Sequence, residues 1–321
     1  MAETRLKMAL VGCGGIAQVH WQGIKEIASR VDVTAVVDTN SDSATAMAQL
    51  TGAEAFFDLE EALKNGDFEA VDIMLPHNLH ESAALACFSA GKHVLLEKPM
   101  AHSLESAERI LQASQKVTTT FMIAEQAQYW TDVIKARELM DAGAIGEVIS
   151  ASGNFYDRVV IDPDAPPPWR YSLAISGGGV TMDGGAHWIR PLRMMMGEVD
   201  EVIGVAGRHV PRMESESWSR MLMKFENGTV GVLTCQNVMH ASGPTDMFRI
   251  TGSEGELQIT GGRDGQLLLF NKEHPRGEVI MSAVEGKRNS YGEEIKDFCK
   301  VVLDGSTMDA THEFSLGELR T

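Results

Sequence analysis

The chain has 321 residues, 44% of them hydrophobic and 23% charged, a composition typical of a soluble globular protein. Its formal net charge of −17 opposes binding to nucleic acid and to anionic membranes. No apolar run approaches the roughly 18 residues that a membrane-spanning helix needs. The length predicts two domains, since single domains usually run to about 100–200 residues.

The polar start of the chain, Met1 to Lys7, leads directly into a strand-like run and lacks the pattern of a signal peptide. No two of the four cysteines form a C-x-x-C pair, so we expect neither a disulfide framework nor a metal site; they are Cys13, Cys87, Cys235 and Cys299. A reducing, cytoplasmic compartment fits these features best.

The first 125 residues alternate between strand-like runs and helical patterns. In chain order we expect a strand over 7–11, a helix over 16–27, a strand over 31–38, helices over 41–50 and 60–63, a strand over 70–75, a helix over 80–90, a strand over 93–96, a helix over 103–115 and a strand over 118–124. Strands separated by helices predict βαβ units, and therefore an α/β fold on a doubly wound parallel sheet.

The pattern changes after residue 125. One helix is expected over 132–141, and strands are expected over 148–154, 199–206, 218–225, 229–236, 248–251, 256–259 and 267–270. Turn sequences such as Asn227-Gly228 separate several of these runs. We therefore predict a dinucleotide-binding domain over 1–125 and, over 126–321, an α/β domain with a large, mostly antiparallel open sheet.

A glycine-rich segment follows the first strand and opens the first helix. Gly12, Gly14 and Ala17 match the pattern G-x-G-x-x-G/A, with Gly15 and Ile16 between the last two positions. Gly12 permits the tight turn, Gly14 lets the backbone approach a pyrophosphate, and the helix N-terminus attracts the anion. The setting of strand, turn and helix makes this a dinucleotide site rather than a glycine-rich turn without a ligand.

Asp38 ends the second strand, 21 residues after Ala17. An acid at this place accepts hydrogen bonds from the adenosine ribose hydroxyls and repels a 2′-phosphate. No Lys or Arg follows within 39–41 to compensate, so NAD is favoured over NADP. A plain strand-end cap is the alternative role for Asp38.

Two further strand ends carry polar residues at the edge of the sheet where ligands bind. The fourth strand ends near Pro76 and Asn78, with His80 close behind, and the fifth runs into Glu97-Lys98-Pro99. These groups either contact the cofactor or act as caps and as a strand-end ion pair.

In the second half, Trp169-Arg170 precedes a stretch with five glycines that contains Asp183 and ends at His187. Crowded glycines indicate close approach of the backbone to a ligand. Pro191 is tolerated in a first helical turn, so a helix should begin near His187. Asp183 and His187 then form either a carboxylate–imidazole pair or a structural cap.

These motifs together resemble the glucose–fructose oxidoreductase / inositol dehydrogenase / MocA family over nearly the whole chain. The resemblance implies an NAD(P)-dependent oxidoreductase that acts on sugars, cyclitols and related hydroxy compounds, in a Rossmann domain followed by an open-sheet domain. It further implies a catalytic set of Lys98, Asp183 and His187, with Glu97 and Arg170 near the cofactor. Dimers or tetramers built through the open sheet are also implied.

Two features depart from the family. Polyol dehydrogenases of the family often have an acid three residues after the histidine, where this chain has Arg190. Arg190 either reaches the pocket and binds the carboxylate of a sugar acid, or it points to solvent or pairs with an acid. The sequence also stops at 315–321, where family chains usually continue into a terminal helix, so either the chain is truncated or the helix is absent.

The expected reaction is hydride transfer between nicotinamide and a carbon that bears a hydroxyl or carbonyl group, with a carbohydrate-like substrate. Aromatic residues offer either sugar-stacking surfaces or core packing; they are Tyr156, Trp169, Tyr171 and Trp188. A non-catalytic protein that senses NAD or a sugar is one rival interpretation, because fold alone does not prove turnover. An NAD-dependent glycosidase is the other.

Overall fold

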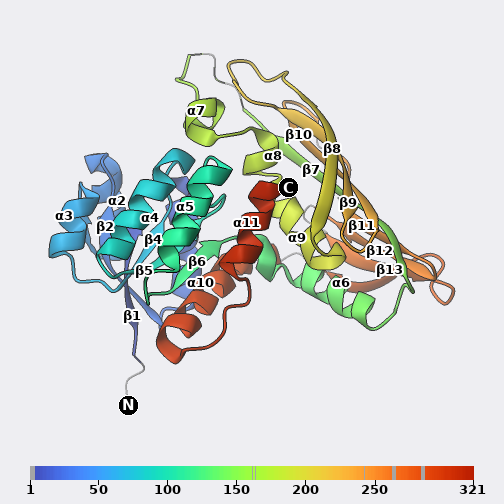
Figure 1. Ribbon diagram of the computed structural model, residues 1–321, viewed down its shortest axis with the longest axis horizontal. Helices are drawn as coiled ribbons and strands as arrows, with labels where there is room; N and C mark the ends of the chain where they lie inside the picture. Colours follow the sequence, from blue (N-terminus) through green and yellow to red (C-terminus); the bar gives the residue numbers. More distant parts are fainter. Residues whose placement is uncertain (1–3, 161, 163, 242, 262–264, 283–285) are drawn as a thin grey trace. The chain divides into compact units, whose positions relative to one another are not determined.

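The computed structural model describes residues 4–321 except 161, 163, 242, 262–264 and 283–285, and the side chains of 286–288 are also left undescribed. The chain forms two compact units (Figure 1). Unit 1 comprises Met1–Glu125 and Asn289–Arg320, and unit 2 comprises Gln126–Arg288 together with Thr321. Residues 289–320 therefore belong to the same unit as the first 125 residues, although the sequence predicted them as part of the second domain.

Unit 1 is built on a parallel sheet with the strand order β3-β2-β1-β4-β5-β6, and all its strand pairs are parallel. Its strands are β1 (Leu6–Val11), β2 (Val31–Val37), β3 (Glu54–Phe56), β4 (Ala70–Ile73), β5 (His93–Glu97) and β6 (Phe121–Ala124). This is the order of a doubly wound dinucleotide-binding fold, whose ligands bind at the carboxyl ends of the strands. The sequence missed only β3, because three residues are too few to show a period.

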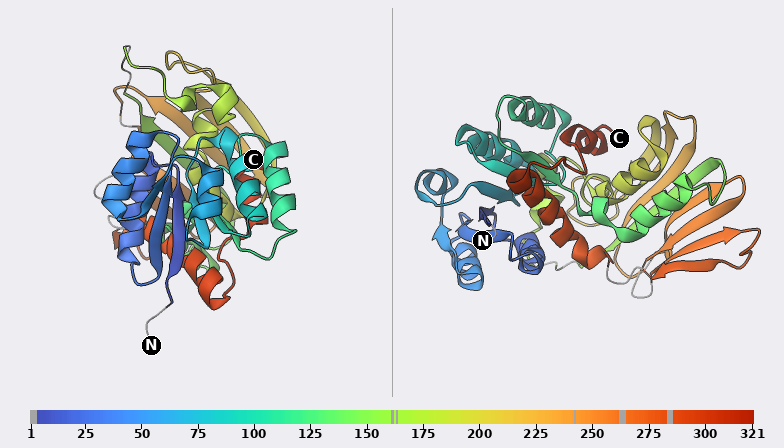
Figure 2. Two further views of the ribbon diagram at one scale, coloured as in Figure 1. Left: turned by 90° about the vertical axis from the view of Figure 1, so that its left-hand side faces the viewer. Right: turned by 90° about the horizontal axis from the view of Figure 1, so that it is seen from below.

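Helices cover both faces of this sheet (Figure 2). They are α1 (Gly15–Glu26), α2 (Ser41–Thr51), α3 (Leu59–Asn65), α4 (His80–Ser89), α5 (Leu104–Ser114), α10 (Gly286–Asp304) and α11 (His312–Arg320), with a 3-10 turn η1 (His77–Leu79). Small and branched side chains of α3, α4, α5 and α11 join the buried strand residues in one apolar core. On the other face α1 meets α10 at Gly23, where an added Cβ would lie 2.8 Å from the Gly292 nitrogen.

The C-terminal segment of unit 1 was not predicted as helical. Ile295, Phe298 and Cys299 of α10 are fully buried, and Leu316 of α11 lies in the core of the sheet domain. Residues 312–320 form a helix that the sequence did not predict, α11, which packs against α5 and β6.

Unit 2 contains a mostly antiparallel sheet with the order β14-β13-β12-β11-β7-β10-β9-β8, in which only β7 and β10 of the described strands pair in parallel. Its strands are β7 (Val148–Arg158), β8 (Val199–Gly207), β9 (Trp218–Phe225), β10 (Val230–Val238), β11 (Asp246–Gly252), β12 (Gly255–Thr260), β13 (Gln266–Asn271) and β14 (Glu278–Ser282). The large open sheet is therefore confirmed, and β14 is an addition to it.

The helices of unit 2 pack on one face of this sheet around an apolar core. They are α6 (Thr131–Asp141), α7 (Leu173–Ser176), α8 (Val180–Asp183) and α9 (Ala186–Met196), with 3-10 turns η2 (Gln126–Tyr129) and η3 (Trp169–Tyr171). The predicted start of α9 near His187 is confirmed within one residue. Pro191 nevertheless lies beyond the first turn, so the carbonyl of His187 loses the N–H that would normally come from residue 191.

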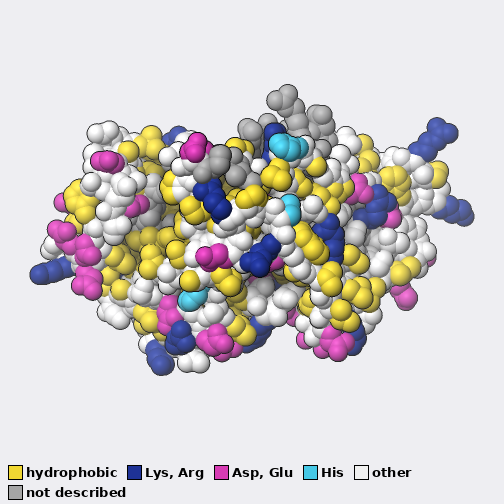
Figure 3. Space-filling model, turned by 90° about the horizontal axis from the view of Figure 1, so that it is seen from above, with side chains coloured by type: hydrophobic (Ala, Val, Ile, Leu, Met, Phe, Trp, Pro, Cys, Tyr) yellow, Lys and Arg dark blue, Asp and Glu magenta, His cyan; other side chains and the backbone are white. Residues whose placement is uncertain are grey.

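Charged side chains of both signs are interspersed on one face of the protein. On the face drawn in Figure 3, Lys and Arg side chains alternate with Asp and Glu among apolar groups. Nucleic-acid-binding proteins instead gather basic residues into a patch or stripe. None of the described helices is long and apolar enough to span a bilayer.

Candidate active site

The glycine-rich loop joins β1 to α1 as the sequence predicted. Gly12 has a φ of +95° and lies so close to β4 that a Cβ would be 2.4 Å from the Met74 carbonyl oxygen, so only glycine fits. Gly14 and Gly15 instead face open space. Gly14 is also the N-cap of α1, and it has no side chain that could accept hydrogen bonds from the N–H groups of the first turn. The N–H groups here, with Ile16 half-buried beside them, fit a phosphate ligand.

Asp38 follows β2 and is fixed by two backbone donors. Cys13 N–H donates to Asp38 Oδ2 over 2.8 Å, and Asn40 N–H donates to Oδ1 over 2.8 Å. Burial, and then Asp38 itself, raises the pKa of the Cys13 thiol to about 12, so this cysteine is a neutral packing residue. The carboxylate keeps lone pairs on both oxygens, as a ribose diol acceptor requires.

The end of β4 continues into η1. Pro76 is half-buried and Asn78 is exposed, so both remain available to a ligand. His80 is fully buried, and its ring nitrogens lie 2.9 Å from the carbonyl oxygens of Leu75 and Pro99. Burial lowers the pKa of His80. Its expected contact with the cofactor therefore does not fit, because the ring is enclosed and braces the ends of two strands.

Glu97 and Lys98 stand where β5 ends. Lys98 is half-buried, and its backbone N–H donates to Ala124 over 3.2 Å, which extends the pairing with β6. Glu97 is 8% exposed and its carboxylate turns inward to His20 of α1, at 3.0 Å. Sequence reasoning missed His20 because its partners, Glu97 and Asp72, lie 77 and 52 residues away.

In unit 2 the glycine-rich stretch folds into α8 and the start of α9. Asp183 is the last residue of α8 and His187 the second of α9, so the Gly184-Gly185 break separates them. Asp183 Oδ2 lies 3.0 Å from Arg170 Nε, and the Arg170 guanidinium is 4.4 Å from the centre of the Trp169 ring. Arg170 is therefore held by an acid and an aromatic face of its own unit.

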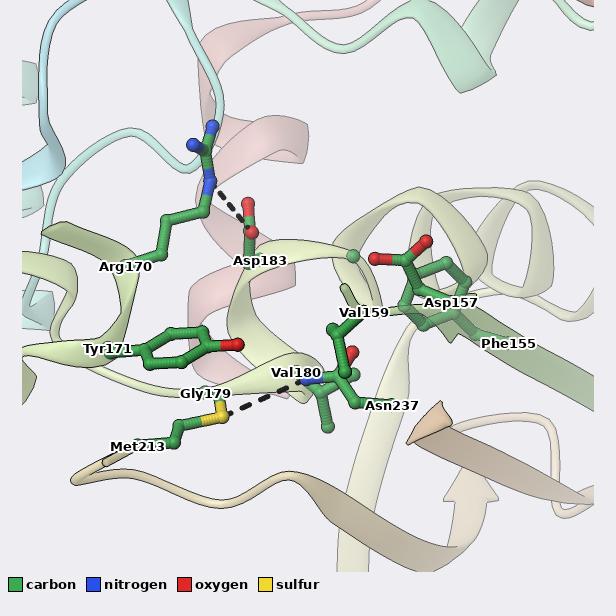
Figure 4. A pocket seen from close by; sticks show the side chains of 11 residues that line it. Phe155, Asp157, Val159, Arg170, Tyr171, Gly179, Val180, Asp183, Met213 and Asn237 are labelled. Carbon is green, nitrogen blue, oxygen red and sulfur yellow. Dashed lines mark hydrogen bonds and ion pairs between the residues drawn. The ribbon is translucent and has the colours of Figure 1, made fainter. Parts of the chain in front are cut away.

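A pocket opens beside this ion pair (Figure 4). Its polar groups are Asp157, Arg170, Tyr171, Asp183 and Asn237, and its apolar wall comprises Phe155, Val159, Val180 and Met213, with Gly179 and Gly184 in the lining. Apolar surface with a few convergent polar groups is typical of small-molecule sites.

Asp157 was not expected in this pocket. Burial, and then the neighbouring carboxylate of Asp183, raises the pKa of Asp157, which indicates that the two acids share the pocket's electrostatic field. The sequence signal was only its position near the end of a strand, which many surface acids share.

Two expected substrate contacts are corrected by the structure. Phe155 and Asp157 line the pocket, and since side chains alternate along a strand, Tyr156 faces the other side of β7, against Gly243. Arg190 is fully buried and its Nη1 donates to Gln128 Oε1 over 3.1 Å. Arg190 is thus neither at the surface nor in the pocket lining. Trp188 is a core residue that packs on Trp130 and Phe248.

Comparison with known proteins finds a matching family model for each of the two units. Residues 6–125 match a family model described as an oxidoreductase family with an NAD-binding Rossmann fold, and residues 133–258 match the GFO/IDH/MocA C-terminal domain. A 4-carboxy-2-hydroxymuconate-6-semialdehyde dehydrogenase from Sphingobium is 32% identical over 307 residues, 94% of this chain and 91% of that one. A myo-inositol 2-dehydrogenase from Thermotoga maritima is 26% identical over 94% of this chain and 89% of its own.

Solved structures show the same architecture. An oxidoreductase of Thermotoga maritima superposes with a TM-score of 0.86 at 28% identity, over 98% of this chain and 94% of that one. A levoglucosan dehydrogenase in complex with NADH and levoglucosan has a TM-score of 0.88 at 22% identity, with the same coverage of both chains, and supports the fold alone. The chain therefore belongs to the glucose–fructose oxidoreductase, inositol dehydrogenase and MocA family of oxidoreductases, and its first unit is an NAD-binding domain.

Proposed function

We propose that this protein transfers hydride between NAD and a secondary hydroxyl or carbonyl carbon of a sugar, glycoside, cyclitol or sugar acid. The pocket of unit 2 carries the proposal, because it combines two carboxylates, a guanidinium, a phenol and a carboxamide with an apolar wall. Such a lining suits a small molecule with several hydroxyl groups and an apolar ring face. NAD, when bound, supplies the hydride acceptor or donor.

The protein's own residues would handle the proton and the oxygen. His187 removes the proton from the substrate hydroxyl, a task that suits an imidazole near neutral pH. Asp183, already anchored by Arg170, orients the imidazole. Lys98, at the end of β5, hydrogen-bonds the reacting oxygen and stabilises the negative charge that develops on it.

The relatives define the substrates to test. The relatives are named as dehydrogenases of levoglucosan, myo-inositol and a carboxylated hydroxymuconate semialdehyde, which are two neutral ring compounds and one anion. In the experiment, the purified protein is incubated with NAD and, one at a time, with sugars, glycosides, cyclitols and sugar acids, and the formation of NADH is measured by its absorbance. Each neutral sugar is matched with its acid. Binding of NAD without turnover of any compound, or glycoside hydrolysis without net NADH, would overturn the proposal.

A further inference from the structure

His20 bridges two carboxylates in the interior of unit 1. It is fully buried on α1; its Nδ1 lies 2.8 Å from Asp72 Oδ2 on β4, and its Nε2 lies 3.0 Å from Glu97 Oε1 on β5. An ionised carboxylate only accepts hydrogen bonds, so both ring nitrogens donate and the ring is an imidazolium. Burial alone lowers the pKa of His20, but the two carboxylates together raise it well above its ordinary value.

Two further acidic residues, Glu294 and Glu125, lie near this bridge. Glu294 of α10 is fully buried, and neither of its carboxyl oxygens has a hydrogen-bond partner. Burial raises the pKa of Glu294 well above its ordinary value. Glu125, which follows β6, also faces the cluster, and the Tyr291 ring centre lies 5.5 Å from that of His20.

The position of the bridge relates it to the chemistry of the unit. Asp72 pairs with Leu95 in the parallel sheet, so Glu97, two residues further along β5, points to the same face, towards α1. The next residue along the chain is Lys98. His20 thus connects the helix that begins at the phosphate-binding loop with the strand end that carries Lys98.

We propose that His20 is a positioning residue for Lys98, and that it acts through Glu97. The proposal rests on the proposed function, in which Lys98 binds the reacting oxygen. Without a donor at Nε2, the buried Glu97 carboxylate would lack the partner that compensates its loss of water, and the end of β5 would shift to find another. A displacement of about 1 Å at a catalytic group is enough to lower a rate by around 100-fold.

Two substitutions of His20 each keep one of its two hydrogen bonds, either the bond to Glu97 or the bond to Asp72. In His20→Gln the side-chain amide nitrogen takes the place of Nε2 and keeps the donor to Glu97, whereas in His20→Asn it takes the place of Nδ1 and keeps the donor to Asp72. Both variants lose the positive charge, so their stabilities should fall alike. We expect His20→Asn to lower kcat by roughly 10- to 100-fold with little change in KM or in the Kd for NAD, and His20→Gln to restore most of that loss.

A second readout needs no substrate. The Lys98 N–H donates to the Ala124 carbonyl over 3.2 Å, and the His93 N–H, at the other end of β5, donates to the Glu69 carbonyl over 3.0 Å. Amide hydrogen exchange at Lys98 should accelerate in His20→Asn and stay near the wild-type rate in His20→Gln, while exchange at His93 stays unchanged in both. His93→Gln is the matched control for a change that destabilises β5 away from Lys98. His93 is the first residue of β5, and its Nδ1 accepts a hydrogen bond from Thr120 N–H.

The outcomes distinguish the inference from the proposed function. Equal kcat losses in the Asn and Gln variants, or unchanged exchange at Lys98 in His20→Asn, would show that His20 only packs α1 on the sheet. If His20→Asn does not fold, Glu97→Ala removes the same bond from the other side and should accelerate exchange at Lys98 equally. Absence of turnover by the wild-type protein across the panel counts against the proposed function, whereas the exchange result still decides the role of His20.

Discussion

The backbone N–H of Cys13 donates to the carboxylate of Asp38 over 2.8 Å, so the glycine-rich loop and the end of β2 are held together by the group expected to recognise ribose. Charge-assisted hydrogen bonds are each worth about 1.5–3 kcal/mol, so Asp38→Ala should weaken NAD binding by roughly 10- to 100-fold. Calorimetric titration with NAD and NADP measures both affinities.

Asp38→Asn serves as the control for charge, because it keeps the shape but removes the repulsion of a 2′-phosphate. The ratio of the Kd for NADP to the Kd for NAD should therefore fall by a larger factor than the Kd for NAD rises. Tighter binding of NADP than of NAD by the wild-type protein would contradict the assigned role of Asp38.

In the proposed mechanism, Lys98 hydrogen-bonds the reacting oxygen of the substrate and His187 removes its proton. Lys98→Ala and His187→Ala should each lower kcat/KM by roughly 100-fold or more, while the Kd for NAD changes little. The double variant should lose less than the product of the two effects, because groups that act as a unit are not additive. Steady-state kinetics provide the check, and near-normal turnover of His187→Ala would place the base elsewhere.

Glu216 holds the short helix that ends in Asp183. Its carboxylate accepts from Gly179 N–H at 2.9 Å and from Thr181 N–H at 3.1 Å, and its carbonyl accepts from Val180 N–H at 3.0 Å. Glu216→Ala should lower kcat/KM without changing the Kd for NAD, and should destabilise unit 2 by about 1 kcal/mol, as loss of a helix cap does.

The control for Glu216 is Glu214→Ala. Glu214 belongs to the same segment and accepts from Leu173 N–H at 2.7 Å, so it caps α7 instead of α8. Equal kinetic losses in the two variants would show that the whole segment, rather than the Asp183 helix, had been disturbed.

Glu294 should make unit 1 less stable as the pH rises. Because burial raises its pKa above that in the unfolded chain, its stabilising contribution is complete below about pH 4.5 and is lost as the pH approaches the folded-state value. Glu294→Gln should therefore be more stable than the wild type at neutral pH, with the difference disappearing at acid pH. Denaturant unfolding between pH 4 and 8 tests this, with the exposed neighbour Glu293→Gln, which pairs with Lys296, as a variant expected to show no such trend.

The uncovered face of the unit 2 sheet carries an apolar row across three strands. Ile203, Leu222 and Val232 are aligned in register and are 74%, 47% and 45% exposed. Since exposed apolar rows of this kind mark interfaces, we expect a homodimer or homotetramer that buries them. Leu222→Glu should yield monomers in light scattering at micromolar concentration, whereas Val160→Glu, at a site 87% exposed after the end of β7, should not. A monomeric wild-type protein would contradict this expectation.

Local patterns explain which features could be predicted from the sequence. The loop at Gly12 and the acid at Asp38 follow from spacing within one βαβ unit. The start of α9 was placed correctly although its premise was wrong, because Pro191 lies inside the helix and not in its first turn. The pocket residue Asp157 and the bridge at His20 depend on tertiary pairing, which no window along the chain displays. The sequence placed Tyr156 in the pocket, which was wrong. Alternation along a strand shows which residues share a face, but it does not show which face lines the pocket until one residue of that face is known to do so.

The return of α10 and α11 to unit 1 affects how the chain can fold during synthesis. Apart from Thr321, unit 2 is the continuous segment Gln126–Arg288, so it can complete its core while still attached to the ribosome. Unit 1 cannot, because Leu316 belongs to its core and Phe298 and Glu294 of α10 are fully buried, and all three are translated after residues 126–288 of unit 2. Until then the nascent sheet lacks the cover of its final two helices, so the NAD-binding domain, although first in the sequence, should reach its native state last.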